Sequence, residues 1–277
     1  MFHSYYGKFK TRIFITIERL LAKVATDKIV VISKQQFEEI HKTFGIGRAE
    51  QFEIIPLGID LHAFHAAADD NLFRSQIGSD KDDFLVGFVG RLTEIKNVPL
   101  LLNAARQLSL NGNRAESKLR FLIIGEGHLR EALERQTAEL GLASQVSFLG
   151  NREDVAHIYS ALDAVALTSL NEGTPLSLIE AMASGRPIIS TSVGGVVDLL
   201  GSKCVEGDGF SVCERGIGTK SDSVDSFANG LTYLVRNSDV RQEMASRGRD
   251  YALSRFSKDR LVYDMKELYR RLLAKGQ

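Results

Sequence analysis

Short apolar runs alternate with segments of helical periodicity through the middle of the chain. The apolar runs predict strands at 84–89, 119–124, 146–149, 164–167 and 187–191. Between them, apolar residues recur every three to four positions, which predicts helices at 98–110, 129–140 and 155–162 and one more after Thr174. Strands that alternate with helices form a parallel sheet with right-handed crossovers. The pattern therefore predicts an α/β fold, whose ligands bind beyond the carboxyl ends of the strands.

The flanking regions have a less regular pattern. Helices are expected at 13–24, 35–44 and 196–200, and strands at 27–33, 53–56 and 210–213, the last within a loop-rich stretch at 201–223. The residues at 66–83 are polar and irregular or weakly helical. Three further helices are predicted at 225–236, 240–252 and 258–275.

The helix after Thr174 is the most informative element. Thr174 is expected to cap it and Pro175 to occupy its first position, while Gly185 and Pro187 end it. Its amino terminus offers free N–H groups to an anion. Glu172 lies just before this helix, and Glu180 lies within its otherwise apolar sequence, where an unpaired carboxylate is costly. A pair of carboxylates that each accept hydrogen bonds from the hydroxyls of a different sugar ring fits better than a glycosidase pair.

Composition and charge exclude several classes of protein. The chain has 277 residues, 44% of them hydrophobic and 25% charged, and its net charge of +0 gives no basis for nucleic-acid binding. We interpret Cys204 and Cys213 as ordinary thiols, because they are too few for a disulfide framework and lack metal-ligand spacing. No apolar run reaches the roughly 18 residues of a transmembrane helix, and no signal peptide is expected. Residues 8–28 are basic and amphipathic, which fits a solvated helix face or a membrane or partner contact.

Two cations follow the strand at 84–89. Arg91 and Lys96 combine a planar fork with a mobile point charge, which suits a diphosphate, although surface charges are the simpler explanation. The turn Gly125-Glu126-Gly127 allows a backbone to approach a ligand, but it is not the dinucleotide fingerprint.

With these motifs in order, the chain resembles the large family of retaining glycosyltransferases with the GT-B fold. The matching stretches run from about residue 27 to residue 200. They are Val31-Ile32-Ser33, Ile55-Pro56-Leu57-Gly58-Ile59-Asp60, Val89-Gly90-Arg91-Leu92 with Lys96, Gly125-Glu126-Gly127, Glu172-Gly173-Thr174-Pro175, Glu180-Ala181-Met182-Ala183, Gly185-Arg186-Pro187 and Val193-Gly194-Gly195.

The resemblance implies a role for each site residue. Arg91 and Lys96 would neutralise the donor diphosphate, Glu172 would face the donor sugar near its C1, and these three residues are the expected catalytic set. Glu180 would bind the ribose hydroxyls, and Arg152 would lie near the base. The remaining expected substrate-binding residues are Gly90, Gly125, Gly127, Gly173, Thr174, Pro175, Leu176 and Ser177. Transfer would retain the anomeric configuration and need no metal or other cofactor.

The resemblance also implies a domain organisation. Residues 84–254 would form a Rossmann-like nucleotide-sugar-binding domain, the carboxy-terminal domain of the GT-B fold. Residues 1–60 would be the remnant of a second Rossmann-like domain, the acceptor domain, which is truncated; 61–83 would be a linker, and 255–277 a helix that crosses back to the acceptor domain. The family usually has a histidine that contacts the donor sugar, and His3 is more simply explained as incidental. Asp198 in place of glutamate, and 210–219 in place of a proline-rich turn, depart from the family pattern.

The expected function is transfer of a sugar from a nucleotide-sugar, most simply a UDP-sugar, to a saccharide or lipid-linked acceptor. The expected product is a cell-surface polysaccharide, such as lipopolysaccharide, or a glycolipid. The expected setting of the protein is the cytoplasm, with peripheral association at the inner membrane face. A non-catalytic nucleotide-sugar-binding module or partner subunit is the main alternative. A nucleotide-sugar epimerase would need an acid/base cluster, and the sequence shows none near Arg91 or Glu180.

Overall fold

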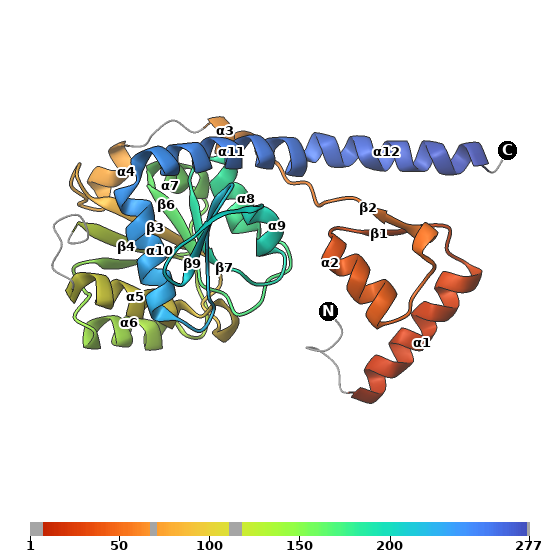
Figure 1. Ribbon diagram of the computed structural model, residues 1–277, viewed down its shortest axis with the longest axis horizontal. Helices are drawn as coiled ribbons and strands as arrows, with labels where there is room; N and C mark the ends of the chain where they lie inside the picture. Colours follow the sequence, from red (N-terminus) through yellow and green to blue (C-terminus); the bar gives the residue numbers. More distant parts are fainter. Residues whose placement is uncertain (1–7, 67–70, 111–117, 276–277) are drawn as a thin grey trace. The chain divides into compact units, whose positions relative to one another are not determined.

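In a computed structural model, the chain divides into two compact units (Figure 1). The structure describes residues 8–66, 71–110 and 118–275. The larger unit comprises residues 60–254, and the smaller one comprises residues 1–59 with 255–277. His3 lies outside the described residues. The stretch 61–83, expected as a linker, carries the short helices α3 (His62–Ala66) and α4 (Asn71–Gln76) and falls within the larger unit.

The described residues of the larger unit form an eight-stranded sheet with the order β5-β4-β3-β6-β7-β10-β9-β8. Its first six strands are parallel, and five of them, all but β10, were predicted as parallel strands. The strands β9 and β8 extend the sheet as an antiparallel hairpin. The central strands are apolar on both faces, which is typical of parallel sheets between helix layers. The strands are β3 (Phe84–Val89), β4 (Leu119–Ile124), β5 (Val146–Gly150), β6 (Ala164–Leu167), β7 (Ile188–Thr191), β8 (Lys203–Glu206), β9 (Phe210–Cys213) and β10 (Gly216–Thr219).

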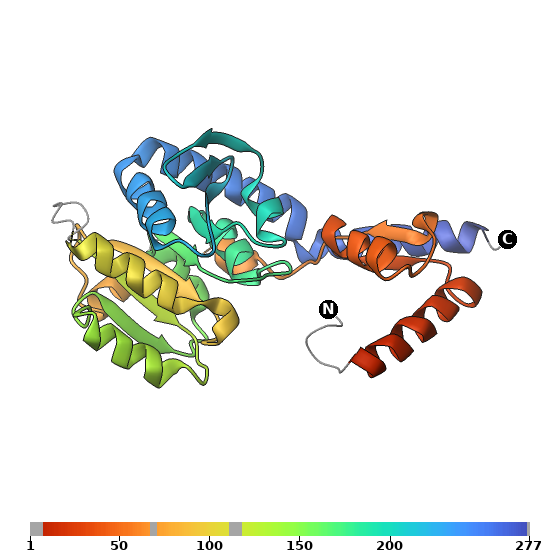
Figure 2. The ribbon, with the colours of Figure 1, turned by 60° about the horizontal axis from the view of Figure 1, so that its bottom comes forward.

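Helices cover both faces of this sheet (Figure 1). One face carries α5 (Val98–Leu110), α6 (Arg130–Glu139) and α10 (Val224–Arg236), with α5 and α6 side by side, yellow and light green in Figure 2. The other face carries α7 (Val155–Ala161), α8 (Leu176–Ala183) and α9 (Val196–Leu200), and α3 packs on α7 and α8. The long helix α11 (Ser238–Phe256) packs against α8, where Gly248 lies beside Met182.

Two local expectations are wrong. Thr174 does not cap α8, because Pro175 has an extended conformation (ψ 115°) and the helix begins only at Leu176. The extended Pro175 itself takes the capping position, so the helix starts one residue later than expected. The apolar pattern also predicts only one strand between residues 201 and 223, whereas β8, β9 and β10 all form there. Both cysteines are free thiols, Cys204 exposed and Cys213 buried.

The smaller unit is a two-stranded parallel sheet with helices around it. A cluster of Ala22, Phe44 and Ile46 joins α1 to the segment after η1. No helix among the described residues is long and apolar enough to cross a membrane. The elements are α1 (Lys8–Val24), β1 (Ile29–Val31), α2 (Lys34–Phe37), the π-helix η1 (Glu38–Thr43), the 3-10 helix η2 (Ala49–Gln51), β2 (Phe52–Ile54) and α12 (Lys258–Lys275).

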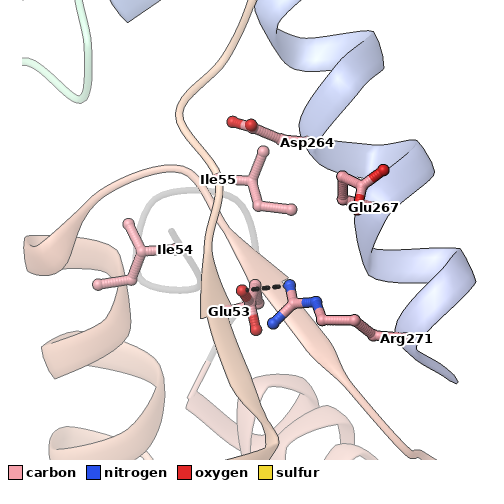
Figure 3. A pocket seen from close by; sticks show the side chains of 6 residues that line it. All are labelled: Glu53, Ile54, Ile55, Asp264, Glu267 and Arg271. Carbon is pink, nitrogen blue, oxygen red and sulfur yellow. Dashed lines mark hydrogen bonds and ion pairs between the residues drawn. The ribbon is translucent and has the colours of Figure 1, made fainter.

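Polar contacts fasten α12 to β2 and the segment after it. Arg260 donates to the carbonyl oxygens of Pro56 and Leu57, each at 2.7 Å, and Arg271 donates to Glu53 Oε1 at 2.8 Å. Figure 3 shows the hollow of about 260 Å³ between these elements, into which three carboxylates project. Each carboxylate is paired with an arginine, so the hollow is a cluster of structural ion pairs. Its lining residues are Glu53, Ile54, Ile55, Asp264, Glu267 and Arg271.

Candidate functional site

The loops at the carboxyl ends of five strands form one continuous edge of the larger unit. Because β5, β4, β3, β6 and β7 are neighbours in the sheet, the loops that follow them lie in the same order. Each loop is joined to the next by a backbone hydrogen bond. These bonds run from Gly125 N to Gly150 O (2.8 Å), Leu92 N to Glu126 O (2.9 Å), Leu170 N to Ile95 O (2.8 Å) and Gly195 N to Glu172 O (3.1 Å).

The strand order reverses between β3 and β6, and ligands of open α/β sheets bind at such a switch point. Lys96 reaches this point from the short 3-10 helix η3 (Glu94–Lys96), and Glu172 reaches it from the loop after β6. Lys96 Nζ donates to Glu172 Oε1 at 2.5 Å, and the Ser169 hydroxyl donates to the same oxygen at 2.6 Å. The two charged side chains are only 18% and 12% exposed, so a nearly buried ion pair marks the switch point.

A cavity of about 220 Å³ opens beside this pair, at the ends of β3, β4 and β5. Its lining brings together four residues that the sequence predicted for the site: Gly90, Arg91, Gly125 and Arg152. A Cβ at Gly90 would lie 3.6 Å from Lys96 Cε, so the lysine stem borders the cavity. The complete lining is Val89, Gly90, Arg91, Ile124, Gly125, Glu126, Asn151, Arg152 and Val155.

The two arginines of the cavity differ in their partners. Arg152 makes a two-pronged contact with Asp154, at 2.8 and 2.5 Å. These hydrogen bonds raise the pKa of Arg152 and lower the pKa of Asp154. Arg91 is exposed, and its guanidinium has no hydrogen-bond or ion-pair partner among the described residues. The cavity therefore carries one neutralised and one available guanidinium.

Glu180 is the second carboxylate of the site. It is half-buried in α8, and burial raises its pKa above the ordinary value of 4.5, although a hydrogen bond from Tyr159 opposes the shift. The Tyr159 hydroxyl lies 3.1 Å from Glu180 Oε2. No cation among the described residues pairs with this carboxylate, so its charge still lacks compensation.

The approach to α8 combines buried and accessible positions. Pro175 is buried, Thr174 and Ser177 are half-buried, and Gly173 and Leu176 are exposed. No side chain caps α8, so the N–H groups of its first turn have no side-chain acceptor from a capping residue. These groups and the helix dipole favour negative charge at this end.

Glycines hold neighbouring loops in close contact. A Cβ on Gly125 would lie 2.0 Å from Gly90 O, and one on Gly127 would lie 2.2 Å from Leu92 O. On the other side of the switch point, a Cβ on Gly194 would lie 1.9 Å from Glu172 O. A Cβ on Gly195 would lie 1.8 Å from Gly173 O. Both glycine pairs are therefore required by loop packing, and contact of Gly125 and Gly127 with a ligand stays a prediction.

Sequence reasoning missed three side chains of the site. Ser169 binds Glu172 and had a local signal, its spacing of three residues from that glutamate. Asn151 lies in the cavity and directly precedes Arg152, which was predicted. Tyr159 contacts Glu180 from a different helix, and no local pattern reports such a contact. The described residues include no group of three or more His, Cys, Asp or Glu side chains that could hold a metal ion.

A mostly parallel sheet covered by helices on both faces, with a reversal of strand order, places the chain among the doubly wound α/β proteins, which bind their ligands at such a switch point. Within this class, the sequence profile of the family described as "Glycosyl transferases group 1" matches residues 69–251. The chain therefore belongs to this family of glycosyltransferases with the GT-B fold.

Curated relatives agree with this assignment. The chain is 30% identical over 221 residues to the UDP-Gal:alpha-D-GlcNAc-diphosphoundecaprenol alpha-1,3-galactosyltransferase of Escherichia coli, covering 79% of this chain and 54% of that protein. It is 29% identical over 255 residues to the D-inositol 3-phosphate glycosyltransferase of Gordonia bronchialis, covering 89% and 53%. An uncharacterized glycosyltransferase of Methanocaldococcus jannaschii is 27% identical over 252 residues, covering 88% and 60%. The chain thus spans between half and two thirds of the length of these relatives.

Solved structures share the fold. HepE of Anabaena in complex with UDP superposes with a TM-score of 0.78 at 24% identity, covering 98% of this chain and 69% of that one. The sucrose-phosphate synthase of Thermosynechococcus elongatus gives a TM-score of 0.77 at 24% identity, covering 95% and 62%.

Proposed function

We propose that this chain carries the donor site of a retaining glycosyltransferase that uses a UDP-sugar. The observation that carries the proposal is the Lys96–Glu172 ion pair at the switch point, beside a cavity that Arg91 lines. The helix α8, which follows the Glu172 loop, adds the Glu180 carboxylate, held by Tyr159. Two cations suit a diphosphate, and two carboxylates with different surroundings suit the hydroxyls of two different rings.

The four side chains take separate parts in the transfer. As the bond between sugar C1 and the diphosphate oxygen breaks, negative charge grows on the diphosphate, and Lys96 and Arg91 stabilise it together with the first turn of α8. Glu172 faces the sugar near C1. The acceptor hydroxyl oxygen bonds to C1 on the face that the diphosphate leaves, and the hydroxyl proton passes to the departing diphosphate oxygen. Glu180 accepts hydrogen bonds from the ribose, and the cavity holds the base beside Arg152.

The protein's own cations provide the counter-charge in this proposal, so transfer requires no metal ion. Lys96 and Arg91 can both bind the diphosphate, with Arg91 unpaired among the described residues and Lys96 shared with the Glu172 carboxylate. Activity that survives exhaustive treatment with a chelator supports this point, and activity that returns only when a divalent cation is added contradicts it.

Two relatives support the proposed substrates. The Escherichia coli protein is named for a UDP-galactose donor and a diphosphoundecaprenol-linked acceptor, and HepE has been solved with UDP-glucose. We propose a UDP-sugar donor and a saccharide or lipid-linked acceptor in the synthesis of a surface polysaccharide such as lipopolysaccharide, or of a glycolipid, in the cytoplasm at the inner face of the membrane.

The helix α1 supports peripheral membrane association. Its apolar side chains are exposed, and Arg12 and Lys23 lie exposed on the same helix, which suits an anionic lipid surface. Co-sedimentation with phosphatidylglycerol vesicles, weakened by Leu20→Glu but not by Leu273→Glu on α12, supports this association; equal binding by both variants contradicts it. The exposed apolar residues of α1 are Ile13, Phe14, Ile17, Leu20, Leu21 and Val24.

Calorimetry with UDP, UDP-glucose and UDP-galactose tests the donor site. We expect Arg91→Ala and Glu180→Ala to weaken binding of UDP by about tenfold or more, because each removes a charged hydrogen-bond partner of the ligand. Arg135→Ala and Glu139→Ala change exposed residues of α6 and serve as matched controls. UDP binding that survives both site substitutions refutes the assigned site.

The alternative function is a nucleotide-sugar-binding module or partner subunit without turnover. The chain spans only 53–60% of the relatives described above. A transfer assay with radiolabelled UDP-sugar separates the two functions. Measurable transfer or donor hydrolysis excludes the module, whereas tight UDP binding without turnover favours it.

A further inference from the structure

Tyr159 is a fully buried phenol whose hydroxyl faces two acceptors on α8. It lies 3.0 Å from the carbonyl oxygen of Ser177 and 3.1 Å from Glu180 Oε2. The hydroxyl has one proton to donate, and both partners accept when Glu180 is ionised. Burial, reinforced by the charge of Glu180, raises the pKa of Tyr159, so the phenol keeps its proton. One donor therefore fastens two points of α8, one turn apart.

The two carboxylate oxygens of Glu180 have different surroundings. Oε2 faces Tyr159, which is the one hydrogen-bond donor to the Glu180 carboxylate among the described residues. Oε1 has no hydrogen-bond partner among the described residues, and it is not a buried atom. It therefore reaches solvent. The Tyr159 hydroxyl therefore holds Oε2 in place, while Oε1 is accessible to a ligand.

The Tyr159 ring is itself held in place. It packs edge-on against Phe64 of α3, with ring centroids 5.8 Å apart and an interplanar angle of 66°. With no exposed surface and contacts on two sides, the ring has little freedom to follow a moving carboxylate. The position of Oε2 is therefore determined by α3 and α7 as well as by α8.

We propose that Tyr159 is the positioning residue for Glu180, holding one carboxylate oxygen so that the other meets the ribose hydroxyls of the nucleotide donor. This inference rests on the proposed function, because it needs Glu180 to bind ribose. Without the phenol oxygen, the buried Oε2 loses its donor, and the carboxylate must rotate toward water or take up a proton. Either response removes the acceptor from the ribose.

A pair of nucleotides separates positioning from mere packing. UDP offers two ribose hydroxyls to Glu180, whereas 2′,3′-dideoxy-UDP offers none and keeps the base and the diphosphate. Tyr159→Phe removes one oxygen and keeps the ring, so the fold should persist, which thermal unfolding checks. Calorimetry then measures both nucleotides against the parent chain, Tyr159→Phe, Glu180→Gln and the double variant.

We expect the parent chain to prefer UDP over the dideoxy nucleotide. Tyr159→Phe should weaken UDP binding about tenfold, as expected for loss of a hydrogen bond to a charged group, and should leave dideoxy-UDP binding within about twofold. The double variant should match Glu180→Gln alone, because Tyr159 acts through that glutamate. Tyr233→Phe makes the same chemical change on α10 and should alter neither affinity.

Three results overturn the inference, and they differ in what else they overturn. If Tyr159→Phe weakens both nucleotides equally, the phenol oxygen serves packing and the inference alone is wrong. If the parent prefers UDP and Tyr159→Phe keeps that preference, the inference is again wrong while Glu180 keeps its ribose role. If the parent binds neither nucleotide, or both equally well, the proposed site itself is wrong and the inference with it.

Discussion

Replacing Glu172 by glutamine tests how the ion pair at the switch point is used. In the absence of a nucleotide, one oxygen of Glu172 receives both Lys96 Nζ at 2.5 Å and the Ser169 hydroxyl at 2.6 Å. A diphosphate that binds Lys96 must therefore share a cation that the protein has already neutralised. Glutamine keeps the shape of the side chain and removes the charge, so Lys96 becomes fully available to the ligand.

The size of the effect follows from burial. A hydrogen bond to a charged group contributes about 1.5–3 kcal/mol. Because Lys96 and Glu172 keep 18% and 12% of their surface exposed, water screens part of the pair, and the lower end of that range applies. A gain of about 1.4 kcal/mol is a tenfold change in Kd. We therefore expect Glu172→Gln to bind UDP about tenfold more tightly at low salt, while its transfer rate falls.

Calorimetry with UDP, run together with a transfer assay, makes the measurement. Lys96→Met should weaken UDP binding, and in that background Glu172→Gln should have no further effect on affinity, because the cation it releases is gone. Asp82→Asn breaks the 2.6 Å pair with Lys118 and is the matched control. If Glu172→Gln binds UDP less tightly than the parent, the glutamate holds the nucleotide directly, and competition between Glu172 and the diphosphate for Lys96 is refuted.

Three further predictions concern stability. Burial raises the pKa of Glu180, so the folded chain binds the carboxyl proton more tightly than the unfolded chain does. The contribution of Glu180 to stability therefore falls as pH rises from 4.5 through the folded pKa. In urea unfolding, the stability of Glu180→Gln relative to the parent should rise from pH 4 to pH 8, and a constant difference contradicts this. Gly195→Ala should cost about 1–3 kcal/mol of stability in thermal unfolding, because the new Cβ would lie 1.8 Å from the carbonyl oxygen of Gly173. Gly248→Ala within α11 is the control and should be neutral or stabilising. Equal effects of the two substitutions contradict the packing argument. Asp163→Ala should cost about 2–4 kcal/mol in urea unfolding, because one oxygen accepts both an arginine of α4 (2.7 Å) and a backbone N–H of β3 (2.8 Å), and a loss below about 0.5 kcal/mol contradicts this.

The sheet could be predicted from the sequence because its strands are short apolar runs with clear polar boundaries. The bounds of β3, β4, β6, β9 and α5 agree with the expectation, since each has strong periodicity and a marked end. The start of α8 could not be predicted, because the conformation of Pro175 decides between two adjacent positions. The strands β8 and β10 were missed because neither is an apolar run: β8 (Lys203-Cys204-Val205-Glu206) is exposed along its whole length, and β10 (Gly216-Ile217-Gly218-Thr219) contains two glycines.

The sequence could predict that several charged residues lie at one edge of the sheet, but not which side chains they contact. Strand ends locate Arg91, Lys96, Glu172 and Arg152 near one edge, since the topology alone brings those ends together. Pairing is a tertiary property: nothing local indicates that Glu172 would neutralise Lys96, or that Tyr159 would reach Glu180. The glycines were interpreted from the sequence as room for a ligand, whereas much of that room is filled by the next loop.

The interlocked glycines also restrict how this scaffold can diversify. A side chain at Gly125, Gly127, Gly194 or Gly195 would collide with a neighbouring carbonyl, so these positions cannot be used to reshape the site. In the proposed glycosyltransferase, we expect variation in sugar preference to come from accessible positions such as Leu170 and Leu176, which flank Glu172 in the sequence and are both exposed. We expect a library randomised at these two leucines to retain the fold and alter donor choice, since it leaves the loop contacts untouched.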